Sequence, residues 1–415
     1  MLILYQGGIA AIRFFYWIAS WFSPKAKAIR LGHKEQVDAL GATFPLSSPA
    51  TLVWVHCASL GEFEQGRPVM EALKTWKPSI KILLTFFSPS GYAVRKDYEF
   101  ADYVFYLPWD TSKNAQWFAE VVRPSLVIFI KYEFWYHYSH ELQKRKIPLI
   151  SISAIFRPQQ NFFKPYGSLF RTILKCFNHF FVQNQQSAGL LHSIGIDQVT
   201  IAGDTRFDRV NQIIRQSQEV PIVEQFKDGQ KMMVIGSAWQ EDMEVLVPFI
   251  NENKSQLKFI VAPHELTENF LMEIERSLKG KSIRFSKAGG STLKEFSVLI
   301  IDNIGMLSRM YRYGEFAFIG GAFRQGLHNI LEAACYGIPI FFGNKAFQKY
   351  QEAVDLVQRG GAFDVENFAE LKSKYELLIR DPQTFQHAVG VTQQYVQENI
   401  GATDKIMSYC KKLLT

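Results

Sequence analysis

The chain has 415 residues, which is enough for two domains of ordinary size. A hydrophobic content of 47% with 20% charged residues indicates a globular protein and excludes a disordered one. The formal net charge of +7 suits an anionic partner such as a nucleotide, a phospholipid or a phosphorylated substrate. The sequence contains no paired Cys/His finger, no RNP-like aromatic motif and no long Lys/Arg run, so we expect no nucleic-acid partner.

The first 22 residues, "MLILYQGGIAAIRFFYWIASWF", are apolar apart from Gln6, Arg13 and Ser20. The stretch is about long enough to span a bilayer, but Arg13 in its middle favours a tilted or interfacial helix. A basic flank follows it, made of Lys25, Lys27, Arg30 and Lys34. We therefore predict a membrane anchor over 1–34, with the rest of the protein on the cytoplasmic side. The alternative is an amphipathic helix packed on the protein itself.

Eleven apolar runs of strand length alternate with helical stretches along the rest of the chain. They cover 51–58, 80–87, 103–109, 125–132, 147–155, 179–184, 232–238, 257–264, 296–302, 315–321 and 338–343. The runs are continuous, which is typical of parallel strands buried on both faces. A polar segment at 199–230 interrupts the rhythm. The pattern predicts two Rossmann-like, doubly wound α/β domains, over 35–210 and 211–415, facing a central cleft.

An acidic residue stands at the first strand-to-helix turn, in "WVHCASLGEFEQGRP" over 54–68. The strand ends, the chain turns through Ser59 and Gly61, and Glu62 stands where a helix begins. An acid in the first helical turn stabilises the helix dipole modestly. Ligands of doubly wound folds bind outside the carboxyl ends of the strands, so the same acid is also a candidate catalytic base. The turn alone leaves both interpretations open.

Polar residues follow several other predicted strands. Ser90 lies in a Ser-Pro-Ser-Gly turn after 80–87, and Glu133 comes just after 125–132. In the second half, Ser237 lies at a strand-to-helix turn, and His264 lies at the end of 257–264. Each is ordinary alone, but together they indicate a ligand cleft between the domains.

The segment "FIGGAFRQGLHNILEAACYGIP" over 318–339 gives the strongest local signal for phosphate. A strand ends in Gly320 and Gly321, and a helix is predicted to open around His328 and Asn329. Glycines allow backbone N–H groups to approach a ligand, and a helix N-terminus offers further donors. Glu332 is placed to accept hydrogen bonds from ribose hydroxyls, or only to cap the helix, because its spacing from Asn329 fits a capping box.

Residues 156–181 interleave many phenylalanines with Arg157, Lys164, Arg171 and Lys175. This pattern suits either a surface that meets anionic lipid or a buried helix with snorkelling basic side chains. No DxD pair beside a strand, HExxH or EF-hand motif is present, so we predict no metal site and no cofactor. The cysteines lack metal or disulfide spacing and are predicted to be reduced core thiols: Cys57, Cys176, Cys335 and Cys410.

Taken together, these motifs resemble the 3-deoxy-D-manno-octulosonic acid (Kdo) transferases, GT-B glycosyltransferases of lipid A assembly. The resemblance runs nearly end to end, in the order and spacing of pieces that are unspecific singly. Besides the N-terminal anchor they are "SLGE" 59–62, "FSPSGY" 87–92, "YLPWD" 106–110, "EFW" 133–135, "AGDTRFD" 202–208, "GSAWQED" 236–242, "FIGGAF" 318–323 and "HNILEAACYGIPIFFG" 328–343.

The resemblance implies an inverting, metal-independent enzyme that moves Kdo from CMP-Kdo to a phosphorylated lipid A precursor (lipid IVA). It implies that Glu62 is the base, with capping as a second role. It places the enzyme on the cytoplasmic side of the inner membrane, against an anionic surface. With the strand ends above, the donor-binding residues are Ser237, His264, Gly320, Gly321, His328, Asn329 and Glu332. The acceptor-binding residues are Ser59, Gly61, Ser90, Glu133 and Arg157.

The chain departs from the family pattern at three places. Many members have Thr-Glu-Leu-Trp-Pro-Asn, preceded by another Glu, where this chain has Lys131 to His137, so one of two acids is absent. Pro263-His264-Glu265 replaces Pro-Arg-His, and 153–160 replaces a more polar acceptor loop. Two alternatives stay open: a non-catalytic GT-B module that binds nucleotide or lipid at the membrane, and a GT-B enzyme that uses a UDP-sugar, or a related epimerase without an anchor.

Overall fold

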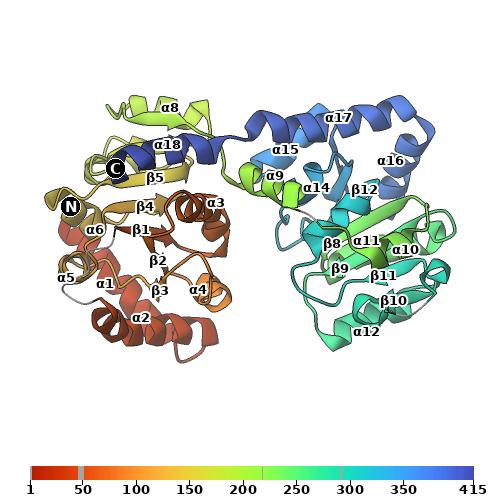
Figure 1. Cartoon of the computed structure of the whole chain (residues 1–415), viewed down its shortest axis with the longest axis horizontal. Helices are drawn as coiled ribbons and strands as arrows, with labels where there is room; N and C mark the ends of the chain where they lie inside the picture. The colour runs from red at the N-terminus through yellow and green to blue at the C-terminus, as the bar shows by residue number, and fades with distance from the viewer. Residues whose placement is uncertain (1, 45–50, 217, 290–291) are drawn as a thin grey trace. The chain divides into compact units, whose positions relative to one another are not determined.

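The structure is a computed structural model that describes residues 2–44, 51–216, 218–289 and 292–415. The side chains of 34–38, which include Lys34 of the predicted basic flank, and of 215–216 lie outside the description. The chain forms two compact units, one of Met1–Arg209 with Ile400–Thr415 and one of Val210–Asn399. Figure 1 shows a sheet with helices in each unit.

The first unit is built on a parallel seven-stranded sheet. Its strands are β1 (Leu52–Cys57), β2 (Lys81–Phe86), β3 (Tyr103–Tyr106), β4 (Leu126–Ile130), β5 (Leu149–Ala154), β6 (His179–Val182) and β7 (Val199–Ile201). Their order in the sheet is β3-β2-β1-β4-β5-β6-β7. Alternate residues of β1 enter two cores: Trp54 packs with Phe129, while Val53 and Val55 pack with Ile128. The sheet is therefore buried on both faces, as the continuous apolar runs predicted.

Helices cover the two faces of this sheet. They are α1 (Leu2–Ala19), α2 (Pro24–Thr43), α3 (Leu60–Trp76), α4 (Pro89–Arg95), α5 (Ser112–Val122), α6 (Tyr136–Lys144), α7 (Ser168–Leu174), α8 (Gln185–His192), α9 (Arg206–Gln216), which continues into the second unit, and α18 (Ala402–Leu414), with a 3-10 turn η1 (Asn161–Phe163).

The second unit repeats the plan. Its strands are β8 (Met232–Ala238), β9 (Lys258–Pro263), β10 (Ser282–Arg284), β11 (Val298–Ile300), β12 (Phe316–Ile319), β13 (Ile340–Gly343) and β14 (Ala362–Val365), in the order β10-β11-β9-β8-β12-β13-β14. Its helices are α10 (Pro221–Lys227), α11 (Gln240–Asn253), α12 (Glu268–Ser277), α13 (Leu307–Met310), α14 (Leu331–Ala334), α15 (Gln351–Arg359), α16 (Phe368–Arg380) and α17 (Pro382–Asn399), with 3-10 turns η2 (Phe285–Lys287), η3 (Leu293–Glu295) and η4 (Tyr311–Tyr313).

Each sheet has one point at which the strand order reverses. In the first sheet the chain runs outward from β1 in one direction through β2 and β3, then returns to place β4 on the other side of β1. In the second sheet the corresponding neighbours are β8 and β12. Connections leave such a pair in opposite directions, and doubly wound folds bind their ligands beside it, at the carboxyl ends of the strands.

All eleven predicted strands are present, which confirms two doubly wound α/β domains. The predicted central cleft is not tested, since the two units are described separately. Three strands in the described part of the chain were not predicted: β7, β10 and β14. All three lie at a sheet edge and have only three or four residues, with polar residues among them. Such strands carry no continuous apolar run.

The last helix differs from the predicted domain 211–415. In the structure α18 belongs to the first unit, because Ile406, Cys410 and Leu414 are buried in the same core as Phe63 of α3. The start of α18 is capped from α9: Oδ1 of Asp208 accepts a hydrogen bond from Gly401 N, and Oδ2 accepts one from Thr403 N, both at 2.6 Å.

The N-terminal helix α1 packs with one face and exposes the other. On the packed face Ile9 is buried, and Tyr5 donates a 2.5 Å hydrogen bond to the buried Asp110. The other face exposes Ile3, Leu4, Phe14, Phe15 and Trp17. By length and composition α1 could cross a membrane, and only 6% of it is buried inside the protein. Features of both sequence interpretations are therefore present in one helix.

The phenylalanines of 156–181 do not form a lipid-facing surface. Phe156, Phe162, Phe177 and Phe180 are buried in the first unit, and all four rings pack around Phe134. Of the two interpretations of this segment, the structure supports a buried core with basic side chains at its rim. Cys57, Cys176 and Cys410 are buried, Cys335 is half-buried, and all four are free thiols.

Candidate active site

Glu62 lies in the first turn of α3, directly after β1 and beside the switch point of the first sheet. Ser59, the residue before the helix, does not cap it; its hydroxyl donates instead to Oε2 of Glu62. Glu62 is half-buried, and none of the ion pairs recorded for the described residues includes it. Glu64, two residues on, pairs with Arg95 at 2.9 Å and Arg67 at 3.8 Å. The two acids therefore have different surroundings.

The other predicted residues of the first unit follow strands adjacent to β1. Ser90 lies exposed in α4 after β2, Glu133 follows β4 and Arg157 follows β5. The strand order is β2-β1-β4-β5, so these residues lie at the carboxyl ends of neighbouring strands, on the same side of the sheet as Ser59, Gly61 and Glu62. Tyr132 lies close enough to interact with both Arg157 and Glu62. Its pKa is raised, chiefly by burial; the Arg157 guanidinium opposes this shift, and the Glu62 carboxylate adds to it. Arg157 also lies over the Tyr132 ring, with Cζ 5.8 Å from its centroid.

Glu133 is engaged by the protein itself. Its Oε2 accepts hydrogen bonds from Trp135 Nε1 at 2.7 Å and from Nε2 of the fully buried His56 at 3.1 Å. The other ring nitrogen of His56, Nδ1, lies 2.9 Å from Oγ1 of Thr85, which accepts from Trp54 Nε1 at 2.7 Å. Nδ1 also lies 3.1 Å from the Thr85 carbonyl oxygen, so both ring nitrogens of His56 are held by the protein. These contacts fix Glu133 and Trp135 beside β1.

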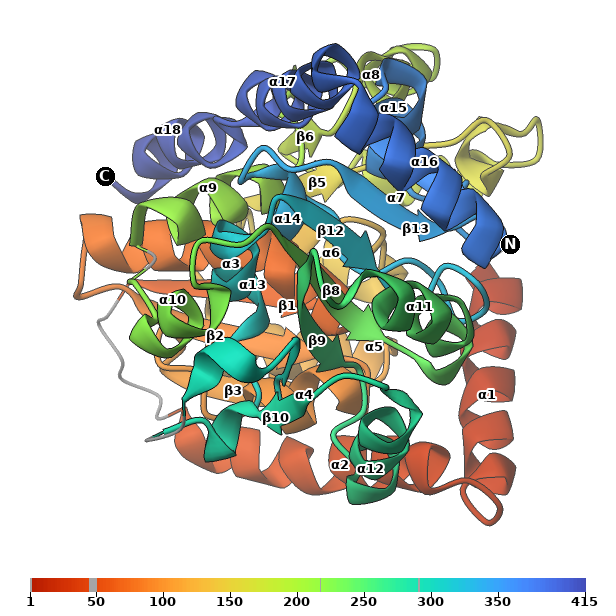
Figure 2. The ribbon, with the colours of Figure 1, turned by 90° about the vertical axis from the view of Figure 1, so that its right-hand side faces the viewer.

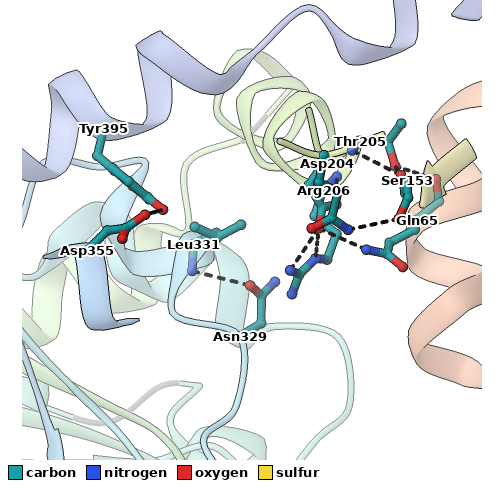
Figure 3. A network of polar contacts seen from close by, with 10 residues as sticks. Gln65, Ser153, Asp204, Thr205, Arg206, Asn329, Leu331, Asp355 and Tyr395 are labelled. Atoms are coloured by element: carbon teal, nitrogen blue, oxygen red, sulfur yellow. Dashed lines mark hydrogen bonds and ion pairs between the residues drawn. The ribbon is translucent and has the colours of Figure 1, made fainter. Parts of the chain in front are cut away.

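The "AGDTRFD" motif holds α3 in place (Figure 3). Gln65, one turn after Glu62, donates through Nε2 to Oδ2 of Asp204 at 2.8 Å, and its backbone carbonyl accepts from the Thr205 hydroxyl. Thr205 also contacts Ser153 of β5, and Arg206 pairs with Asp204 at 2.9 Å. Burial opposes the charge on Asp204, but the Arg206 guanidinium and the hydrogen bonds hold its pKa below the usual value.

In the second unit, Gly320 and Gly321 form a tight turn after β12, at the β8/β12 switch point. A Cβ on Gly320 would lie 2.3 Å from the Ser237 carbonyl oxygen, and Gly321 has φ +93°. Ser237 itself has φ +52°, which is strained for a residue with a side chain. The two strand ends are thus packed backbone to backbone, and only glycine fits there.

Asp242 of α11 binds both sides of this switch point. Its Oδ2 accepts from Gly321 N and from Trp239 N, each at 2.8 Å. The side chain is fully buried, and burial raises its pKa to about 6 despite these two hydrogen bonds. Its second oxygen, Oδ1, has no hydrogen-bond partner among the described residues.

Three rings stack beside the glycine turn. Trp239 lies on His264 with centroids 4.2 Å apart, and His264 lies 4.5 Å from His328. Trp239 Nε1 also donates to Nε2 of His328 at 3.0 Å. Burial lowers the pKa of His328 to about 4, and that of His264 is lowered too, so both rings are uncharged at neutral pH. The predicted donor residues Ser237, His264, Gly320, Gly321 and His328 therefore lie together.

The helix predicted to open around His328 and Asn329 begins two residues later and covers Leu331–Ala334. Asn329 lies just before it, and its Oδ1 accepts from Leu331 N at 3.2 Å (Figure 3). Asn329 Nδ2 also donates to Oε1 of Glu332 at 3.1 Å. One turn of helix has little dipole, so it offers a phosphate much less than a long helix would.

Sequence reasoning gave no role to His56, Tyr132, Asp204, Trp239 or Asp242. The sequence carried a local signal for Asp242, three residues after Trp239 at a strand-to-helix turn, which is capping spacing. The others depend on contacts between distant segments. Among the residues that the structure describes, no group of three or more His, Cys, Asp or Glu side chains is placed to hold a metal ion.

A family model described as 3-deoxy-D-manno-octulosonic-acid transferase (kdotransferase) matches residues 29–209, the segment that contains Glu62 and Asp204. The 3-deoxy-D-manno-octulosonic acid transferase of Aquifex aeolicus is 28% identical over 354 residues, which cover 83% of this chain and 91% of that protein. The enzyme of the same name from Rickettsia felis is 27% identical over 338 residues, 79% of this chain and 72% of that one.

The chain is similar to the Kdo transferases along most of its length. It is a glycosyltransferase, as the resemblance of its motifs implied. The fold is GT-B. Among solved structures, UDP-GlcNAc 2-epimerase from Neisseria meningitidis bound to UDP-GlcNAc matches with a TM-score of 0.60, covering 87% of this chain and 100% of that one. At 16% sequence identity this likeness concerns the fold alone.

Proposed function

We propose that this glycosyltransferase transfers Kdo from CMP-Kdo to a phosphorylated lipid A precursor, lipid IVA, with inversion and without a metal, as a step of lipopolysaccharide synthesis. The observation that carries the proposal is Glu62. Its carboxylate lies half-buried at the carboxyl edge of β1, bound to a neutral hydroxyl, while the neighbouring Glu64 is paired by arginines. A carboxylate without a cationic partner is better suited to accept a proton.

In the proposed reaction, an acceptor hydroxyl attacks the anomeric carbon of Kdo. Its proton passes to Glu62 as the new C–O bond forms. The bond from that carbon to the phosphate oxygen breaks, and CMP leaves with the electron pair. A single displacement of this kind inverts the anomeric centre. A positioned general base contributes about 10²–10⁴ in rate.

The donor side of the proposal is the second switch point. The N–H groups of Gly320 and Gly321 already donate to Gly236 O and to Asp242, so we propose that this turn binds the donor by its compact shape. The rings of His264 and His328 provide flat, neutral surfaces next to it. Asn329 and Glu332 are proposed to bind the nucleotide sugar beyond the turn, with Ser237 on the opposite strand.

We propose that the acceptor binds at the carboxyl ends of the central strands of the first sheet. Ser59, Gly61 and Ser90 provide small polar groups there, and the exposed Arg157 provides the positive charge that a phosphorylated acceptor needs. Oε2 of Glu133 is taken by His56 and Trp135, and the side chain is 10% exposed. We therefore propose that Glu133 acts on the acceptor mainly by holding Trp135.

Incubation of the purified full chain with CMP-Kdo and lipid IVA, followed by mass analysis of the lipid, tests this function. We expect a product heavier by Kdo, formed equally well with EDTA. A matched reaction with UDP-GlcNAc in place of CMP-Kdo should give no product. Transfer from the UDP-sugar alone would favour the UDP-sugar alternative, and intact binding without any product would favour the non-catalytic module.

The proposed location is the cytoplasmic side of the inner membrane, against its anionic lipid surface. Support comes from α1, whose exposed face is apolar while its other face is fixed to the first unit through Tyr5 and Asp110. A helix fixed in this way along a polar domain is better placed to lie in the membrane interface than to cross the bilayer.

A further inference from the structure

A cavity of about 830 Å³ lies between α1, α2 and the segment that follows β3. From α1 its lining includes Arg13, Phe14 and Trp17, and from α2 it includes Arg30 and His33. Trp109 comes from the third side. Figure 2 shows α1 and α2 as successive helices that meet at a sharp turn. The cavity is large enough for a ligand of ordinary size.

The lining joins positive charge to aromatic surface. Arg13 and Arg30 are both among the lining residues, and no Asp or Glu is. Burial lowers the pKa of His33 to about 4, and its Nε2 lies 3.1 Å from the Phe87 carbonyl oxygen, so His33 is neutral and donates there. The two guanidinium groups therefore supply the charge. A ligand that matches both features has an anionic head and an apolar tail.

The position of Arg13 is the second observation. Arg13 is exposed and stands in the middle of an apolar helix. In the proposed membrane location, a charged side chain at this position is costly unless it has a partner. No ion pair is recorded for Arg13 or Arg30 within the described ranges of the chain. A phosphate would pair with both guanidinium groups, since arginine binds phosphate through two parallel hydrogen bonds.

A neighbouring hollow of about 690 Å³ continues this surface. Arg30 lines it as well, together with Lys27, Trp21 and Phe22 at the turn between the two helices. Phe22 is 82% exposed. Basic residues beside exposed aromatic ones are typical of a surface that lies at the level of the lipid headgroups.

We infer that the cavity between α1 and α2 binds an acyl lipid whose phosphate-bearing head has a net negative charge, with the phosphate on Arg13 and Arg30 and the first part of an acyl chain against Phe14, Trp17 and Trp109. This inference rests on the proposed membrane location but not on sugar transfer. Two sources carry this chemistry, the anionic glycerophospholipids of the bilayer and the phosphorylated acceptor.

Native mass spectrometry of the detergent-solubilised full chain tests the inference without an activity measurement. The probes are phosphatidylglycerol, lipid IVA, phosphatidylcholine and inorganic phosphate. We expect a one-to-one adduct with phosphatidylglycerol or with lipid IVA, and the stronger of the two identifies the source. The Arg13→Gln/Arg30→Gln variant should lower that adduct about tenfold or more, while Arg13→Lys/Arg30→Lys should retain part of it.

The matched control is Lys96→Gln/Lys144→Gln, which removes two charges from exposed positions of the same unit outside the lining. It should leave the adduct unchanged. Thermal unfolding of each variant shows whether it is folded. Equal binding of phosphatidylcholine, equal binding of inorganic phosphate alone, or an unchanged adduct in the folded Arg13→Gln/Arg30→Gln variant would overturn the inference.

Discussion

Gln65 of α3 donates a 2.8 Å hydrogen bond to the buried carboxylate of Asp204, 139 residues later in the chain (Figure 3). Gln65 stands one turn after Glu62, so this contact fixes the helical turn that carries the proposed base. Asp204 is in turn paired with Arg206. A motif with no chemistry of its own thus determines where the Glu62 carboxylate lies.

Asp204→Ala should therefore affect stability and turnover together. It removes an acceptor from Gln65 and from Arg206, and we expect a loss of about 2–3 kcal/mol in the free energy of unfolding. Urea unfolding measures this loss, and the rate of sugar transfer should fall in the protein that stays folded. Asp97→Ala, at an exposed position of the same unit, is the control and should change both by little. Equal stability of the two variants would contradict the positioning role.

Gly320→Ala tests the close packing at the second switch point. The added Cβ would lie 2.3 Å from the Ser237 carbonyl oxygen and 2.8 Å from Ala238 Cα, and both are backbone atoms. We expect destabilisation by about 1–3 kcal/mol together with weaker donor binding. In Gly390→Ala of α17 the new Cβ has no neighbour within 4 Å, so that variant should gain up to about 1 kcal/mol. Calorimetry of donor binding and thermal unfolding distinguish the two.

Asp242 should make stability depend on pH. Burial raises its folded pKa to about 6, above the usual 3.8, so the folded state holds the proton more tightly than the unfolded state. Stability from this group is therefore fully present below about pH 4 and decreases as the pH rises to about 6, in total on the order of 2–3 kcal/mol. In Asp242→Asn this decrease should disappear. Urea unfolding over this range, parent against variant, measures it; parallel curves would show that Asp242 does not titrate there.

The exposed face of α1 should hold the protein at membranes. Ile3, Leu4 and Phe15 lie outside the lining of the cavity, and each is worth about 1.5–3 kcal/mol on full burial in an apolar phase. Their replacement by Ser should move the chain to the soluble fraction in vesicle flotation while Tyr5 still binds Asp110. The control replaces Val94, Ile304 and Leu377, which are also exposed, by Ser. If the α1 variant still floats as the parent does, α1 is not the anchor.

The central strands were predictable because β1, β4, β8 and β12 are buried on both faces and leave continuous apolar runs in the sequence. The short edge strands leave no such run. The place of α18 depends on a match between its apolar face and that of α3, which no local pattern records. Sequence reasoning therefore described the centre of each sheet and the edge strand β3, missed the edge strands β7, β10 and β14, and assigned α18 to the other domain.

The residues of the candidate site also fall into two groups, those with a local sequence signature and those whose contacts join distant segments. Glu62, Gly320 and Gly321 stand at strand-to-helix turns, and such turns have local signatures. The contacts of His56 with Glu133 and of Gln65 with Asp204 join segments 77 and 139 residues apart, so they arise only when the sheet forms. The helix predicted to open around His328 and Asn329 begins at Leu331, because capping spacing fixes the start of a helix only to within one or two residues.

The measurement that tests the central claim most directly is the rate of Kdo transfer by Glu62→Gln, compared with Glu64→Gln, in the reaction with CMP-Kdo and lipid IVA. Gln keeps the size of the side chain and can still accept from the Ser59 hydroxyl, but it cannot take the proton. We predict that Glu62→Gln folds, binds CMP-Kdo as the parent does and loses about 10²–10⁴ in rate, while Glu64→Gln stays within a fewfold of the parent. Transfer by Glu62→Gln at near the parent rate would show that the carboxylate only stabilises the helix and that the base is another residue.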